Sequence, residues 1–131
     1  MMQLGGALLV GAGGFLGSIL RYVLGSAIGR WTSSGGIPLG TLGVNVLGCM
    51  ALGMAMGFHE AREDPSANVR LFLMVGVLGG FTTFSTFGYE TLELFRQNGA
   101  FLSAVNVVAQ VSLGLLAAWA GYALAGWFTA S

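Results

Sequence analysis

Four long hydrophobic segments follow one another along the chain, and only short polar stretches separate them. The first segment carries a single charged side chain, Arg21, and the other three carry none. A helix needs about 20 mostly apolar residues to cross the hydrocarbon core of a bilayer. The pattern therefore predicts four membrane-spanning helices, over residues 1–28, 39–58, 71–89 and 97–131.

The links between these segments are short, and the sequence predicts turns at WTSSGGIP (31–38) and RQNG (96–99). The stretch HEAREDPSANVR (59–70) is the one distinctly aqueous loop. Because the number of spans is even, we expect both termini on the same side of the membrane as this loop.

Composition supports the same fold class. The 131 residues are 55% hydrophobic and 8% charged, whereas a typical soluble domain is about 25% charged. We expect an all-α integral membrane protein with a single four-helix transmembrane domain over residues 1–131. The formal net charge is zero, which gives no reason to expect a nucleic acid partner. The N-terminus lacks a basic region and an A-x-A cleavage motif, so no removable signal peptide is expected.

No catalytic or side-chain metal site is expected. Cys49 is the sole cysteine, which excludes a disulfide framework and a thiolate site within one chain. His59 is the sole histidine and lies in the aqueous loop, and no pair of carboxylates lies at membrane depth. The sequence therefore predicts a protein that is not an enzyme.

The arginines are divided almost evenly between the two sides of the predicted bundle. Arg62 and Arg70 lie on the side of the termini, and Arg30 and Arg96 lie on the other side, with Arg21 inside the first span. The positive-inside rule then gives no strong orientation. Two interpretations stay open: a weak orientation set by one arginine, or copies that insert both ways and pair antiparallel.

Glycines in the first two spans are typical of close helix packing. Helices in lipid gain little from hydrophobic burial against each other, so close approach of their backbones matters more. Three G-x-x-x-G pairs suit this role: Gly13 and Gly17, Gly25 and Gly29, and Gly53 and Gly57.

The stretch GGFTTFSTF (79–87) is unusual within a hydrophobic span. Gly79 and Gly80, followed by Thr82 and Thr83, predict a helix break near the middle of the third span. Carbonyl groups freed by a break need partners, which other helices, water or a cation could supply. The alternative is a continuous helix whose hydroxyl groups bond back to the preceding turn. The double glycine favours the break.

Phenylalanines recur in this stretch at a spacing of three, and hydroxyl residues lie between them. The edge of a phenyl ring is electropositive and can hold an anion, whereas its face attracts a cation. The sequence does not say which way the rings turn. The residues concerned are Phe81, Phe84, Phe87, Thr83, Ser85 and Thr86.

Further polar residues lie within the predicted spans, where polar groups usually face protein or a water-filled cavity. The Asn45 amide could donate to an anion, and Asn106 and Gln110 lie one helical turn apart in the fourth span, with Ser112 nearby. Each could form only an interhelical hydrogen bond, but several donors in three spans favour a path for an ion. Arg21 could attract anions to a vestibule or extend to the interface.

The pieces GGFLGSILRY (13–22), GTLGVNVLG (40–48) and GGFTTFSTFGYE (79–90) make the chain resemble the fluoride channel family called Fluc or CrcB. The resemblance covers essentially the whole chain. It implies a dual-topology homodimer of two antiparallel four-helix subunits in the bacterial inner membrane. Two pores per dimer would let fluoride leave the cytoplasm passively.

The resemblance also implies roles for individual residues. The carbonyl groups of Gly79 and Thr82 would bind a structural sodium ion at the dimer centre, and Phe84 and Phe87 would line the pores. Asn45 would be the pore asparagine. The same resemblance places Arg21 at a vestibule and hydroxyl groups near the path at Thr83, Ser85 and Thr86. In the fourth span the chain departs from the hydroxyl residues typical of the family and offers Asn106, Gln110 and Ser112.

Two other functions fit a small four-span protein. A multidrug exporter would need a carboxylate embedded in the membrane, but only Glu90, toward the end of the third span, comes near that depth. Its predicted place near the membrane surface favours a structural role. A subunit that only binds a partner through its glycines would not need polar residues in three spans. Both alternatives are therefore disfavoured.

Overall fold

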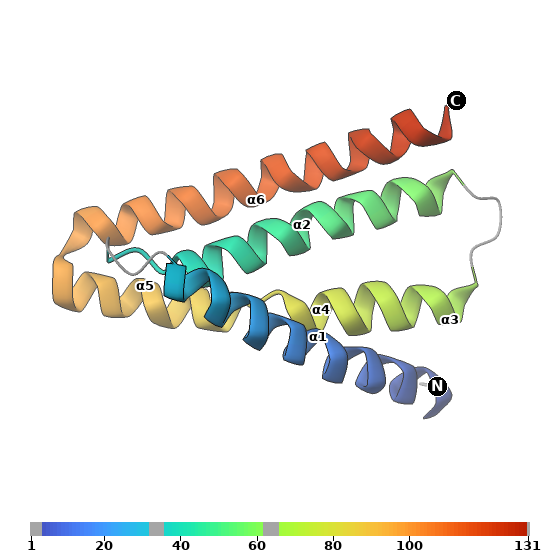
Figure 1. Cartoon of the computed structure of the whole chain (residues 1–131), viewed down its shortest axis with the longest axis horizontal. Coiled ribbons are helices and arrows are strands. Elements are labelled where there is room, and N and C mark those ends of the chain that lie inside the picture. Colours follow the sequence, from blue (N-terminus) through green and yellow to red (C-terminus); the bar gives the residue numbers. More distant parts are fainter. Residues whose placement is uncertain (1–3, 32–35, 62–65, 131) are drawn as a thin grey trace.

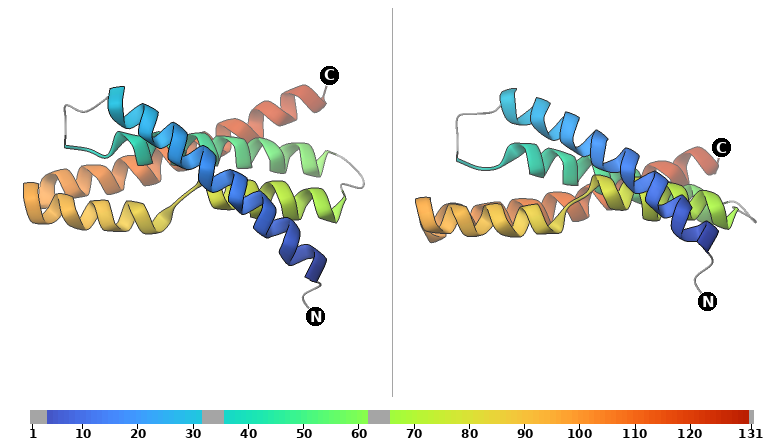
Figure 2. Two further views of the ribbon diagram at one scale, coloured as in Figure 1. Left: turned by 60° about the horizontal axis from the view of Figure 1, so that its bottom comes forward. Right: turned by 90° about the horizontal axis from the view of Figure 1, so that it is seen from below.

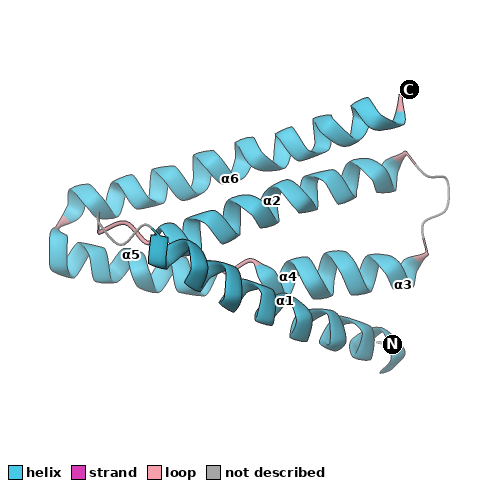
Figure 3. Ribbon diagram, in the orientation of Figure 1, coloured by secondary structure: helices cyan, strands magenta, loops and turns pink. Residues whose placement is uncertain are grey.

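Helices make up nearly all of the chain that the computed structural model describes, which comprises residues 4–31, 36–61 and 66–130 (Figures 1 and 3). The elements, in chain order, are α1 (Leu4–Trp31), α2 (Leu39–Glu60), α3 (Ala67–Arg70), the π-helical segment η1 (Leu71–Leu78), α4 (Gly79–Phe81), α5 (Phe84–Asn98) and α6 (Ala100–Thr129).

The four predicted spans are confirmed as four long helical stretches, each long and apolar enough to cross a membrane. The third runs over Ala67–Asn98 and comprises α3, η1, α4 and α5. It begins four residues earlier and ends nine residues later than predicted. The turn predicted at RQNG is confirmed only at its last residue, because α5 continues to Asn98 and the reversal is made at Gly99 (φ 85°). Glycine adopts this left-handed conformation without steric cost.

The spans run alternately up and down (Figures 1 and 2). The start of α1, the end of α2, the start of α3 and the end of α6 lie at one end of the bundle, which we call the terminal end. The end of α1, the start of α2 and the reversal at Gly99 between α5 and α6 lie at the opposite end, the Gly99 end. For the residues that the structure describes, this agrees with the expectation that both termini share a side. Arg30 and Arg96 belong to the Gly99 end and Arg70 to the terminal end, whereas Arg62 lies outside the described residues.

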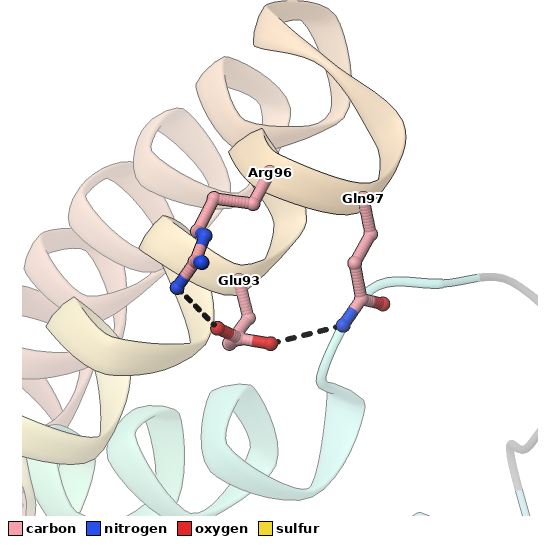
Figure 4. A network of polar contacts seen from close by, with 3 residues as sticks. All are labelled: Glu93, Arg96 and Gln97. Atoms are coloured by element: carbon pink, nitrogen blue, oxygen red, sulfur yellow. Dashed lines mark hydrogen bonds and ion pairs between the residues drawn. The ribbon is translucent and has the colours of Figure 1, made fainter.

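Charged side chains of α5 lie at the bundle surface at the Gly99 end (Figure 4). Glu93 accepts a hydrogen bond of 2.9 Å from Gln97 and forms an ion pair of 3.6 Å with Arg96 (Figure 4). The Arg96 side chain is 70% exposed, so water screens the pair and its contribution to stability is small. This end of α5 therefore projects from the apolar part of the bundle.

Glycines bring two pairs of helices into backbone contact. α1 crosses η1 and α4 obliquely (Figure 2), and a Cβ atom added at Gly13 or Gly17 would overlap the backbone of Phe72 or Val77. The second pair is α2 and α6, where a Cβ atom at Gly53 would overlap the Ala118 carbonyl oxygen. The predicted packing role of these glycines is confirmed.

The third predicted glycine pair is not required for close packing. A Cβ atom at Gly25 would lie at an ordinary contact distance of 3.5 Å from Val44, and one at Gly29 would meet open space. The close approach of α1 and α2 depends here on Gly40, where a Cβ atom would lie 2.6 Å from the Gly25 carbonyl oxygen. The predicted packing role is therefore wrong for Gly25 and Gly29.

The outer surface of the chain is strongly apolar. Large side chains such as Phe15, Phe101 and Trp119 are each more than 60% exposed, whereas Val44 and Ala125 are almost fully buried. An apolar surface of this extent requires lipid or a partner protein to cover it.

Candidate functional site

The third span is interrupted at two threonines. Thr82 (φ −80°, ψ 157°) and Thr83 (φ −148°, ψ 114°) are extended, and Phe84 begins a new helix. The predicted break is confirmed, and a continuous helix is excluded. The expectation that the glycines themselves form the break is wrong, because Gly79 and Gly80 are helical. Gly80 instead allows close packing, since a Cβ atom there would lie 2.7 Å from the Gly14 carbonyl oxygen. Threonine is β-branched and favours the extended backbone.

Asn45 of α2 holds the extended backbone in place. Its Oδ1 accepts a hydrogen bond of 2.9 Å from the Thr83 N–H, and its Nδ2 donates to the Thr83 carbonyl oxygen at 3.2 Å. The same Nδ2 donates to Gln110 Oε1 at 3.0 Å. The side-chain amide thus pairs with Thr83 as a neighbouring strand would, and it links the break to α6. Asn45 and Gln110, both predicted site residues, are brought together.

Thr83 also caps the helix that follows. Its Oγ1 accepts a hydrogen bond of 3.2 Å from the Thr86 N–H and donates to Thr86 Oγ1 at 2.9 Å. The Ser85 hydroxyl lies 3.5 Å from Thr83 Oγ1. A hydroxyl residue at this position satisfies a backbone N–H that has no helical acceptor. The three predicted hydroxyl residues therefore form one cluster at the start of α5.

Two carbonyl groups at the break lose their usual helical donors. In a continuous helix the Gly79 and Thr82 oxygens would accept from the N–H groups of Thr83 and Thr86. Those groups donate instead to Asn45 Oδ1 and to Thr83 Oγ1. Gly79 lies on an exposed face and Thr82 is partly exposed. Free carbonyl oxygens suit a hard cation such as sodium. No group of three or more His, Cys, Asp or Glu residues that could hold a metal occurs within the described ranges.

Two open cavities meet at Thr83. The first, which we call the vestibule cavity, measures about 530 Å³ and is lined by Arg21, Thr41, Thr86 and Glu90 among others. The second, the ring cavity, measures about 320 Å³ and is lined by residues that include Asn45, Gly79, Thr82, Phe84, Phe87 and Gln110. Thr83 lines both cavities. The residues that fix the break therefore separate a polar space from an aromatic one.

Phe84 and Phe87 meet edge to face in the ring cavity, with ring centroids 5.5 Å apart and an angle of 66° between the rings. Phe84 is 82% exposed. Phe81 is buried instead, and its ring carbon lies 3.1 Å from the place of a Cβ atom at Gly48. Only two of the three regularly spaced phenylalanines therefore line a cavity.

The polar residues of α6 have different surroundings. Gln110 Nε2 is buried without a hydrogen-bond partner among the described residues, and Gln110 lines the ring cavity. Asn106 is fully buried where α5 meets α6, and its Nδ2 donates to Thr91 Oγ1 at 2.8 Å. Ser112 is exposed and is absent from the lining of both cavities. Of these three residues, only Gln110 lines one of the two cavities, and its unpartnered Nε2 is itself buried.

A contact between Thr41 and Glu90 was not predicted. Thr41 Oγ1 donates to Glu90 Oε1 at 2.8 Å, and Glu90 Oε2 is buried without a partner in the part of the chain that the structure describes. Both residues line the vestibule cavity. A sequence signal existed, because Thr41 lies one helical turn before Asn45 and so shares its face of α2.

The family model and the similar proteins found for this chain all belong to one family. Residues 8–122 match the family described as CrcB-like protein, Camphor Resistance (CrcB). The chain is 47% identical over 120 residues to the fluoride-specific ion channel FluC of Solibacter usitatus, which covers 90% of this chain and 96% of that protein. It is 43% identical over 118 residues to FluC 3 of Methanosarcina barkeri, covering 90% and 88% of the two chains. The FluC of Methylobacillus flagellatus is 38% identical over 117 residues, covering 89% and 91%.

Proposed function

Because this chain belongs to the CrcB/FluC family of fluoride-specific ion channels, we propose that it conducts fluoride passively out of the cytoplasm. It is a multi-pass membrane channel protein and not an enzyme. One observation carries the proposal: the extended Thr83, held by Asn45, lies between the vestibule cavity and the ring cavity.

The donors along this route are neutral. Fluoride is small and holds its water tightly, so a pore must replace the hydration shell without trapping the ion. Thr86 accepts the Thr83 proton, which leaves its own hydroxyl proton available to the vestibule cavity. Ser85, whose hydroxyl lies 3.5 Å from Thr83 Oγ1, lines neither cavity of the single chain. In the ring cavity the edges of Phe84 and Phe87 supply positive groups, and the buried, unpartnered Gln110 amide nitrogen would have to turn toward the cavity to add another.

Asn45 has a different role in this proposal from the one expected from sequence. Its two N–H bonds go to the Thr83 carbonyl and to Gln110. Asn45 therefore positions the residues that supply donors to the path. Its own amide could donate to fluoride only after breaking one of these two hydrogen bonds. For Asn106 the neighbouring contacts favour a role in packing α5 against α6.

Arg21 supports the mouth of the path. It lines the vestibule cavity, and the described residues offer it no ion pair. A partly buried cation raises the local concentration of anions without entering the narrow part of a pore. Ser112 lies apart from both cavities in one chain, so any contribution to a path requires a second copy.

We further propose that the functional unit is an antiparallel homodimer of dual topology with two pores. The exposed Gly79 and Phe84 support this arrangement, because both belong to the ring cavity and have no cover from their own chain. The carbonyl groups of Gly79 and Thr82 would hold a structural sodium ion, which would fix the break by adding charge–dipole attraction.

A flux assay tests the channel proposal. Purified protein in liposomes should release fluoride far faster than chloride, and without a proton gradient. Equal leakage of both anions, or strict dependence on a pH gradient, would exclude a fluoride-selective passive channel; the second result would favour an exporter.

The orientation in cells tests the dimer proposal separately. The variants Arg30→Cys and Arg70→Cys are each made in a Cys49→Ser background, so that each protein has one cysteine. An impermeant maleimide should label each of them from both sides of the membrane. A single orientation would refute dual topology and leave the flux result unaffected.

A further inference from the structure

A third cavity lies at the terminal end, away from the proposed path. It measures about 470 Å³ and lies between the last turns of α2 and the start of the third span. Its walls are apolar side chains, including Met54, Phe58, Leu73 and Met74. It shares only Met74 with the ring cavity and no residue with the vestibule cavity. We call it the terminal groove.

Two nitrogen-bearing side chains, His59 and Arg70, also line the terminal groove. Arg70 is exposed and has no ion pair or hydrogen bond from its side chain among the described residues. The nearest described carboxylate in the sequence, Glu60, accepts a hydrogen bond of 2.6 Å from Tyr122 on α6. The Glu60 carboxylate therefore faces α6 and not the terminal groove.

His59 and Arg70 both lie close to one end of the bundle, where a lipid headgroup would lie. His59 lies at the end of α2 and Arg70 at the end of α3, both at the terminal end of the bundle. In a membrane this end of the bundle lies at the water interface, and the apolar walls extend from it toward the hydrocarbon core. A guanidinium group binds phosphate oxygens in a bidentate manner, and an imidazole N–H can add one hydrogen bond.

We propose that the terminal groove binds an anionic phospholipid, with the phosphate at Arg70 and His59 and an acyl chain along the apolar walls. Any lipid chain can cover an apolar groove, but the Arg70 cation, which has no partner among the described residues, favours an anionic headgroup. A basic residue near the membrane surface favours anionic over neutral lipid by about fivefold. The site is independent of the fluoride path.

Native mass spectrometry of the detergent-solubilised protein tests this site. The protein is mixed with equal amounts of palmitoyl-oleoyl phosphatidylglycerol and phosphatidylcholine, and the bound lipid is measured. We expect wild type to retain phosphatidylglycerol about fivefold more than phosphatidylcholine. Arg70→Gln should abolish this preference, whereas Arg96→Gln, which removes the same charge at the Gly99 end, should keep it.

A second variant tests the acyl chain contact. Ala55 lines the groove, and Ala55→Trp should fill it and reduce retention of both lipids severalfold. Equal retention of the two lipids by wild type, or equal losses in Arg70→Gln and Arg96→Gln, would overturn the proposal. Unchanged binding in Ala55→Trp would overturn the placement of the acyl chain. Absence of bound lipid on wild type would likewise overturn the proposal.

Discussion

The two halves of the third span pack in different ways. In the first half, η1 and α4 lie against α1 with backbone touching backbone at glycines such as Gly13 and Gly17. The second half, α5, lies against α6 through side-chain hydrogen bonds. Ser103 donates to the Thr91 carbonyl oxygen at 3.1 Å and Asn106 to Thr91 Oγ1 at 2.8 Å.

This difference explains the position of the break. Helices in lipid associate either by close approach of small residues or by interhelical hydrogen bonds. The third span uses the first means before Thr82 and the second after Thr83, so it changes its neighbour at these residues. α2 contacts both halves there, because Gly48 packs against Phe81 and Asn45 binds Thr83. The break is thus a junction between two kinds of packing, and the proposed path passes through it.

The largest expected effect comes from separating α1 from the first half. In Gly17→Val the new Cβ atom would lie 2.8 Å from the Phe81 backbone nitrogen and would overlap the Val77 carbonyl oxygen. Neither backbone atom can move without displacing a helix. We therefore expect the free energy of unfolding to fall by about 3 kcal/mol or more. The measurement is thermal unfolding in detergent, together with the yield of monodisperse protein.

Gly11→Val is the matched control for this change. Gly11 belongs to the same helix, but a Cβ atom there meets open space. We expect its melting temperature to stay close to that of wild type. If the two variants were equally stable, backbone contact would not hold α1 in place.

The second largest effect is expected at the junction itself. Asn45→Leu removes the two bonds to Thr83 and the bond to Gln110, and it leaves buried polar groups unpaired. Each such group costs about 1–3 kcal/mol, so we expect the melting temperature and the fluoride flux to fall together. Asn45→Asp keeps the acceptor for the Thr83 N–H but turns a carboxylate oxygen toward the Thr83 and Gln110 oxygens, so it should be destabilised as well. A stable Asn45→Leu protein with wild-type fluoride flux would show that Asn45 does not hold the junction between the two halves of the third span.

These expectations show what the sequence could and could not predict. The spans follow from hydrophobic length, and the packing role of Gly13 and Gly17 follows from their spacing. The break was predicted within a few residues, but at the glycines, because propensity alone does not reveal that Gly80 faces Gly14. The partners of Asn45 were not predictable, since they depend on how α2 and α6 are rotated about their axes.

A smaller effect, on flux alone, is expected for Phe84→Ile. The Phe84 ring is mostly exposed in the single chain and meets the Phe87 ring at 5.5 Å. Loss of an aromatic edge removes about 0.5–1.5 kcal/mol of interaction, which corresponds to a fall in fluoride flux of up to about tenfold. Elution as a dimer should be unchanged. Unaltered flux would remove this ring from the path.

The smallest effect is expected in the second half of the span, where packing depends on single hydrogen bonds. Thr91→Val keeps the shape of the side chain but removes the hydroxyl that accepts from Asn106 and donates to the Phe87 carbonyl at 2.7 Å. Interhelical hydrogen bonds in membrane proteins contribute about 0.6 kcal/mol on average, so we expect a small fall in melting temperature and normal fluoride flux. Val108→Ala, at an exposed position of α6, is the control and should leave both unchanged. The comparison would fail if Thr91→Val lowered the melting temperature as much as Gly17→Val. Hydrogen bonds would then stabilise the second half of the third span as strongly as glycine contacts stabilise the first half.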